Sequence, residues 1–140
     1  MMIDLVNMLE LPQFHDCLIK NVQIIDDFFN IYIDTQGLQI GMQTNTDQVV
    51  LRFSGFDDVE YDCQGIIYHY NPDLSIEGQE YYGSEFTNVF QEKKMTIQIK
   101  EILCKRGIVQ VNGAIETNEK CEYTQSVQIW IYAREMNCDG

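Results

Sequence analysis

The fold class follows most directly from one stretch in the last third of the chain, Met95-Thr96-Ile97-Gln98-Ile99-Lys100-Glu101-Ile102-Leu103-Cys104-Lys105-Arg106-Gly107-Ile108-Val109-Gln110-Val111. In its first half, Ile97 and Ile99 alternate with polar residues, which is the period of two expected of a half-buried strand. Lys105-Arg106-Gly107 follows as a turn, because glycine tolerates the positive φ that tight hairpins require. Val109 and Val111 then resume the alternation, so the stretch predicts two antiparallel strands joined by a hairpin turn.

The same signals recur along most of the chain. Turns are expected at Asp26-Asp27, at Gly37 and at Asn71-Pro72-Asp73. No regular alternation of strands and helices is present, which favours an antiparallel sheet. We therefore predict a mainly β fold, with a single domain over 1–140 and about eight strands, packed as a sandwich or a strongly curved sheet. Besides the hairpin, the expected strands are 18–25, 29–34, 38–42, 49–54, 59–62, 66–70 and 127–133.

Two short helices are expected beside the strands. The first covers residues 4–11, with Asp4 as its N-cap and Pro12 as its stop. The second follows Ser84, because apolar residues recur there at helical spacing and two lysines suit the negative end of a helix dipole. These residues are Phe86, Val89, Phe90, Lys93 and Lys94.

The charge of the chain excludes several classes of partner. Its 140 residues include 22 acidic and 9 basic ones, so the formal net charge is −13. Hydrophobic residues make up 45% of the chain, which is normal for a folded domain with a sizeable core. The negative field would repel the phosphates of nucleic acids and the surfaces of anionic membranes. We therefore expect neither nucleic acid nor membrane as a partner.

The start of the chain and its cysteines indicate a cytoplasmic protein. The first basic residue is Lys20, whereas a secretory signal begins with positive charge. The longest hydrophobic run, 129–133, is far too short to span a bilayer. The five cysteines are widely spaced and none form a Cys-x-x-Cys pair, which argues against a disulfide framework and a zinc ribbon. They are interpreted as reduced thiols, most of them buried.

The most reactive residue types cluster in Phe14-His15-Asp16-Cys17. A catalytic interpretation would make Cys17 a thiolate that is activated by a histidine and oriented by a carboxylate. Neighbouring residues of an extended segment point to opposite sides, however, so His15 does not readily reach Cys17. We favour a structural motif in which His15 and Asp16 make turn or capping hydrogen bonds at the entrance to the first strand.

An acidic segment offers oxygen ligands for calcium, and its members are Asp57, Asp58, Glu60 and Asp62. The glycine and the bidentate glutamate of an EF-hand loop are missing, so a solvated turn and strand face is the preferred interpretation. Motifs of serine hydrolases, phosphate-binding loops and zinc proteases are also missing from the sequence. We expect no metal, no cofactor and no enzymatic activity.

Aromatic residues crowd 68–90, around a polar and irregular stretch over 77–85. Tyrosine has a large apolar body and a polar tip, which suits protein interfaces. The alternative is that these rings cover the core beneath a long loop. With the acidic segment, the candidate contact residues of a partner are Tyr68, Tyr70, Tyr81 and Tyr82.

The first 60 residues carry a resemblance. Phe14-His15-Asp16-Cys17-Leu18-Ile19 and Leu51-Arg52-Phe53-Ser54-Gly55 resemble the Phe-His-Asp-x-x-Ile strand and the Leu-x-Phe-x-Gly step of a group of small bacterial domains. Cys17 stands where those domains have serine or alanine. Some of them are similar to proposed immunity proteins, which bind and block a toxin in the producing cell. The resemblance implies a binding protein and supplies no catalytic residue.

These observations favour a non-enzymatic protein-binding domain of the immunity or inhibitor type, whose negative charge would attract a basic toxin. The alternative is a β-barrel or sandwich that binds a small molecule. A third interpretation is a self-associating domain that pairs through exposed strand edges. The oligomeric state stays open at this level.

Overall fold

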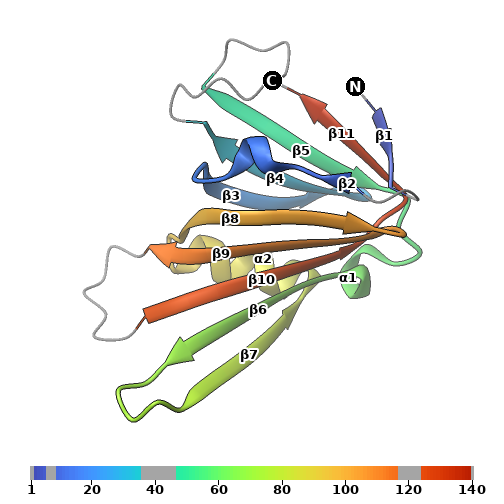
Figure 1. Cartoon of the computed structure of the whole chain (residues 1–140). Coiled ribbons are helices and arrows are strands. Elements are labelled where there is room, and N and C mark those ends of the chain that lie inside the picture. The colour runs from blue at the N-terminus through green and yellow to red at the C-terminus, as the bar shows by residue number, and fades with distance from the viewer. Residues whose placement is uncertain (1, 6–8, 36–46, 117–123, 140) are drawn as a thin grey trace.

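Eleven strands form one antiparallel sheet in the computed structural model, which describes residues 2–5, 9–35, 47–116 and 124–139 (Figure 1). Their order across the sheet is β1-β11-β5-β4-β3-β8-β9-β10-β6-β7, and β2 pairs with β8 beside this path. The strands are β1 Met2–Asp4, β2 Leu9–Glu10, β3 Leu18–Ile25, β4 Phe28–Asp34, β5 Gln48–Ser54, β6 Cys63–Tyr70, β7 Ile76–Tyr82, β8 Thr96–Lys105, β9 Ile108–Glu116, β10 Thr124–Tyr132 and β11 Glu135–Asp139. The helical elements are η1 Pro12–Phe14, α1 Val59–Asp62 and α2 Gly83–Glu92.

The hydrophobic core lies on one face of the sheet, and strands from both halves of the sheet contribute residues to it. On β8, Ile97 and Ile99 are buried and pair with the inward positions of β9. A bulge between Ile99 and Glu101 keeps Ile102 and Cys104 on the same buried side. Because the ten-residue α2 is too small to cover so wide a face, the sheet itself must bend around the core. The observed architecture is thus the single curved sheet, and the described strands do not close into a barrel.

Helix α2 is placed against the inner face by two phenylalanines. Phe86 and Phe90 are buried, and their rings meet edge to face with 6.4 Å between centroids. Opposite them, a Cβ atom added to Gly65 would lie 2.2 Å from Phe86 ring atoms, so the ring rests directly on the backbone of β6. Figure 1 shows α2 behind β9 and β10, on the side of the sheet that it covers.

Most of the expected elements are confirmed. The predicted hairpin at 105–107 joins β8 to β9, with Arg106 and Gly107 at φ of 53° and 79°. Asp26 at φ 54° turns β3 into β4, and α2 occupies the predicted helical segment. The expected strand over 38–42 and its turn at Gly37 lie outside the described residues.

Two expectations near the chain start and middle were wrong. In place of a helix over 4–11, the described residues form β1 and β2, and Leu5 is buried while its N–H donates to the Arg134 carbonyl at 3.0 Å. An isolated helix of that length is marginal, so pairing with the sheet prevails. The expected strand over 59–62 is the helical turn α1, because the Asp58 carboxylate caps the Glu60 N–H and the Asp62 carboxylate binds the N–H groups of Asp57 and Asp58 just before the turn.

Besides β1 and β2, two more strands were not expected. Residues 77–85, which predicted a loop, are divided between β7 and the start of α2. Strand β11 at Glu135–Asp139 also lacked a hydrophobic run. Both are strands at or near an end of the sheet; β7 is held almost entirely by backbone pairing, and β11 adds one buried core residue, Met136.

Candidate protein-binding surface

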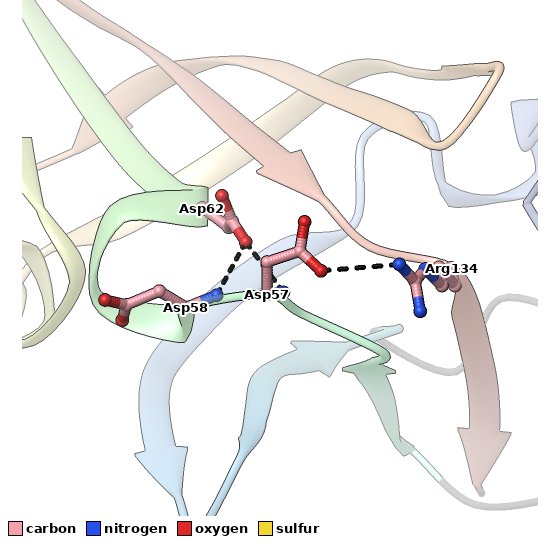
Figure 2. Close-up of polar contacts among 4 residues, drawn as sticks. All are labelled: Asp57, Asp58, Asp62 and Arg134. Atoms are coloured by element: carbon pink, nitrogen blue, oxygen red, sulfur yellow. Dashed lines mark hydrogen bonds and ion pairs between the residues drawn. The ribbon is translucent and has the colours of Figure 1, made fainter.

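The acidic segment folds around its own carboxylates. One Asp62 oxygen, Oδ2, accepts hydrogen bonds from the backbone N–H groups of Asp57 at 3.1 Å and Asp58 at 3.0 Å (Figure 2). Asp58 in turn caps α1, since its Oδ1 accepts from the Glu60 N–H at 3.0 Å. These are the capping contacts that orphan N–H groups at a helix start require. Asp58 and Asp62 therefore have a structural role that the sequence analysis did not foresee.

Glu60 connects this segment to α2. Its carboxylate accepts hydrogen bonds from the Ser84 N–H at 2.7 Å and from the Ser84 hydroxyl. A negative charge at this end also suits the dipole of α2. The chain passes so close that a Cβ on Gly83, which has φ of 50°, would meet Glu60. The Asp57 side chain is 88% exposed and forms an ion pair of 3.3 Å with Arg134.

The four predicted tyrosines divide between the two faces of the sheet. Tyr68, Tyr70 and Tyr82 lie on the outer face, where their hydroxyls meet polar neighbours. Tyr68 donates to Gln128 at 3.1 Å, Tyr70 lies 3.0 Å from the Ser126 hydroxyl, and Gln64 donates to Tyr82 at 3.2 Å. Tyr81 faces inward and packs against the core, and burial followed by the nearby Glu85 raises the pKa of its hydroxyl. The structure therefore brings three of the four together.

The outer face also contains apolar residues that were not among the predicted contact residues. Ile76 on β7 is 61% exposed and lies opposite Tyr70. Trp130 on β10 lies opposite Gln64, which in turn lies opposite Tyr82. Its place could have been read from the buried Ile129 and Ile131 on either side, because alternate strand residues point to opposite faces. We call this surface the tyrosine face: Tyr68, Tyr70, Ile76, Tyr82 and Trp130.

A shallow groove of about 440 Å³ runs along the tyrosine face. Tyr68, Tyr70 and Ile76 line one side of it, and Lys100 and Glu101 on β8 line the other. Aromatic and polar groups thus lie side by side across the outer surface of five neighbouring strands, from β8 to β7. This mixture is typical of protein interfaces, in which an apolar centre is surrounded by a polar rim.

The stretch of chain that forms this end of the sheet contains acidic residues but no basic ones. From Phe53 to Glu92 the chain has no lysine or arginine, although it covers α1, β6, β7 and α2. Strand β10, which flanks β6, has no charged residue. The same stretch contains nine of the 22 acidic residues: Asp57, Asp58, Glu60, Asp62, Asp73, Glu77, Glu80, Glu85 and Glu92. The stretch that contains β6 and β7 is therefore acidic and without basic residues of its own, and Lys100 of β8 lies across the groove from its tyrosines.

The Phe14-His15-Asp16-Cys17 motif forms a turn that places β3 beside β8. Phe14 is buried, and its carbonyl accepts from the Cys17 N–H at 3.0 Å. Asp16 has φ of 68°, and its N–H donates to the Ile99 carbonyl at 2.9 Å. The His15 N–H donates to the Pro12 carbonyl at 3.0 Å, so this segment is a turn held by backbone hydrogen bonds. His15 Nδ1 lies 3.1 Å from an Asp16 oxygen, on the solvent side of this turn.

Cys17 does not have the environment of a nucleophile. Its side chain is fully buried, and burial, followed by the charges of Asp34 and Asp16, raises the pKa of the thiol. A nucleophilic cysteine needs the opposite shift. Burial also raises the pKa values of the thiols at Cys63, Cys104 and Cys138.

Two further findings concern the described part of the chain. None of its clusters brings together three histidine, cysteine, aspartate or glutamate side chains that could hold a metal ion. None of its helices is long and apolar enough to cross a membrane.

Comparison of the chain with protein-family models, with curated proteins and with solved structures gave no significant match.

Proposed function

We propose that this protein is a non-enzymatic binding domain whose tyrosine face docks on a basic protein. The single observation that carries the proposal is the coincidence of exposed aromatic side chains with a stretch of 40 residues, 53–92, that lacks lysine and arginine. Aromatic residues supply much of the energy of protein interfaces, and a concentrated charge selects and steers the partner. A basic partner would meet both features at one end of the sheet.

The resemblance of the first 60 residues suggests what such binding would achieve. An immunity or inhibitor protein acts by covering a toxin, and it needs no catalytic residue of its own. A basic nuclease is a fitting toxin, because its substrate-binding surface is positive and would be attracted to this acidic end. Neutralisation of such a toxin would take place in the cytoplasm of a bacterium.

The alternative of a small-molecule carrier has less support. Its interior would have to hold the ligand, whereas the inner face of this sheet is filled with large buried side chains, among them Phe14, Phe29 and Phe53. The outer groove is open and lined partly by charged residues. Ligand pockets are usually concave and mostly apolar, so the groove fits a protein surface better.

Two variants with matched exposure test the proposed surface. Tyr70 and Phe28 are both 41% exposed, but Phe28 lies at the start of β4, in the other half of the sheet. The proteins encoded next to this one are expressed, and their binding is measured by calorimetry. We expect Tyr70→Ser to raise the Kd of the cognate partner roughly tenfold or more, and Phe28→Ser to change it by less than about twofold.

The ionic strength provides a second criterion. The Kd of a basic partner rises with salt, because screening weakens attraction between exposed charges. A partner whose binding is insensitive to salt would contradict the electrostatic part of the proposal. Equal losses in both variants, or no binding by any adjacent protein, would overturn the proposal itself.

A further inference from the structure

Strand β7 ends the sheet with an open edge. It pairs only with β6 among the described strands, through seven consecutive residue pairs without a bulge. All of its residues except Tyr81 are exposed. Proteins usually protect such edges with charged side chains, proline, bulges or very short strands; β7 has neither proline nor bulge, and its only charged side chains are the carboxylates of Glu77 and Glu80. The opposite end of the sheet, by contrast, is the three-residue β1.

The hydrogen bond at the hairpin tip identifies which residues of β7 direct their N–H and C=O groups away from β6. The Asn71 N–H donates to the Ser75 carbonyl at 2.9 Å, so these two residues form a hydrogen-bonded pair at the tip. Hydrogen-bonded and non-hydrogen-bonded pairs alternate in an antiparallel ladder. The next pair, Tyr70 with Ile76, is therefore non-hydrogen-bonded, as are the pairs at Gly78 and Glu80. Ile76, Gly78 and Glu80 thus direct their N–H and C=O groups away from β6.

The turn that precedes β7 holds this edge in place. Asp73 Oδ1 accepts hydrogen bonds from the Ser75 N–H at 3.0 Å and from the Ser75 hydroxyl at 2.6 Å. Asn71 adds a hydrogen bond of 3.0 Å to the same hydroxyl. The hairpin therefore presents an extended strand that needs little ordering before a partner pairs with it, and such preorganisation lowers the cost of binding.

The charges along the edge select the occupant. Glu77 and Glu80 lie on opposite faces of β7, and no lysine or arginine occurs on β6, β7, α1 or α2. An added strand whose side chains alternate between the faces would meet a carboxylate on either side. A second copy of this chain is disfavoured, because each copy carries a net charge of −13.

We propose that β7 is a docking edge on which an extended, lysine- or arginine-rich segment of the partner adds as a further strand of the sheet. This inference rests on the proposed function and specifies how the partner binds. Backbone hydrogen bonds to Ile76, Gly78 and Glu80 would supply affinity, and contacts with Glu77, Glu80 and the tyrosine face would supply selectivity. Side chains of the added strand on the outer face would lie next to Ile76.

Peptide titrations followed by NMR test the backbone pairing. The full chain, labelled with ¹⁵N, is titrated with the capped heptapeptide Lys-Lys-Thr-Lys-Lys-Thr-Lys, which as a strand presents lysines on both faces. Controls are the same peptide with N-methyl groups at alternate residues and a peptide with glutamate in place of lysine. We expect shifts and slowed hydrogen exchange at the amides of Ile76, Gly78 and Glu80. N-methylation should raise the Kd roughly tenfold or more, since several hydrogen bonds are lost, and the acidic peptide should not bind.

A matched pair of protein variants separates the contribution of backbone hydrogen bonds to binding from the contribution of the Glu80 charge. Glu80→Pro and Glu80→Thr both remove the carboxylate, but only proline removes the outward N–H. An edge strand tolerates such a proline, and the NMR spectrum reports whether the fold is retained. We expect Glu80→Pro to bind the lysine peptide roughly three- to tenfold more weakly than Glu80→Thr.

Several outcomes would overturn the inference. These are equal binding of the N-methylated peptide, equal Kd values for the two Glu80 variants, shifts confined to the tyrosine face, or no shifts at all. Concentration-dependent shifts of the same amides without peptide would identify a second copy as the occupant. If a cognate partner loses affinity with Tyr70→Ser but not with Glu80→Pro, the proposed function stands and the docking edge fails. If no cognate partner binds, the proposed function fails by itself.

Discussion

The ring of Tyr68 lies over Gly78 on the neighbouring strand. A Cβ atom added to Gly78 would lie 3.1 Å from Cε1 and 3.2 Å from Cδ1 of that ring. The Tyr68 hydroxyl meanwhile donates to Gln128 on β10. One side chain thus connects three strands and shields the weakest residue of the edge strand, an arrangement by which aromatic residues stabilise glycine in sheets.

The contact between Tyr68 and Gly78 predicts that Gly78→Thr changes the free energy of unfolding differently in the wild-type protein and in a Tyr68→Ser variant. Gly78→Thr should destabilise the protein by about 0.5–1 kcal/mol, because the Tyr68 ring must shift. In a Tyr68→Ser background the ring is absent, and the higher strand propensity of threonine should make Gly78→Thr neutral or stabilising. Urea denaturation of the four proteins gives the coupling energy. Additive effects would show that the ring and the glycine are independent.

A tighter contact holds α2 against the sheet. Gly65→Ala should destabilise the protein by about 2–3 kcal/mol, because the added methyl group would overlap the Phe86 ring. The control is Gly65→Ala combined with Phe86→Leu, in which the smaller side chain leaves room and should recover part of the loss. Thermal unfolding followed by circular dichroism measures both. A neutral Gly65→Ala would mean that α2 moves freely over β6.

The sequence predicted best the elements that bury alternate side chains. Strands β4, β8 and β10 alternate hydrophobic and more polar side chains over most of their length, so hydrophobic periodicity reveals them directly. Strand β7 escaped this approach because it buries almost nothing and is held by pairing with β6. The turn α1 was mistaken for a strand because Val59 and Tyr61 alternate with acidic residues. Its capping carboxylates decided the conformation, and their role depends on geometry.

The candidate site could be predicted only in part, because its geometry depends on strand pairing as well as on local sequence. Tyrosines at 68, 70 and 82 share a face only because β6 and β7 pair in a particular register, which no local pattern specifies. Tyr81 could not be separated from Tyr82 without knowing that these residues belong to a strand. Once β7 is known, the period of two places Tyr82 outward and Tyr81 inward.

Glu60 predicts a link between the acidic segment and the stability of α2. Glu60→Ala removes an acceptor of the Ser84 N–H and hydroxyl, and should cost about 1–2 kcal/mol in the free energy of unfolding. Glu77→Ala removes the same charge from an exposed strand position, and should change stability by less than about 0.5 kcal/mol. Chemical denaturation compares the two. Equal effects would mean that net charge, and not the cap, is responsible.

The buried thiols predict a loss of stability at alkaline pH. Burial is the main cause that raises the pKa of Cys63, and the charges of Asp62 and Glu60 add to it. In the unfolded chain this thiol ionises near its ordinary pKa of about 8.5, whereas in the folded protein it stays protonated. Its contribution to stability is therefore fully present below that pH and is lost as the pH rises, by up to about 1.4 kcal/mol per pH unit for one thiol. Urea denaturation at pH 7.5 and pH 9.5 should show this decline, and Cys63→Ala should make it shallower. An unchanged slope in Cys63→Ala would mean that other groups, such as the tyrosines, cause the decline.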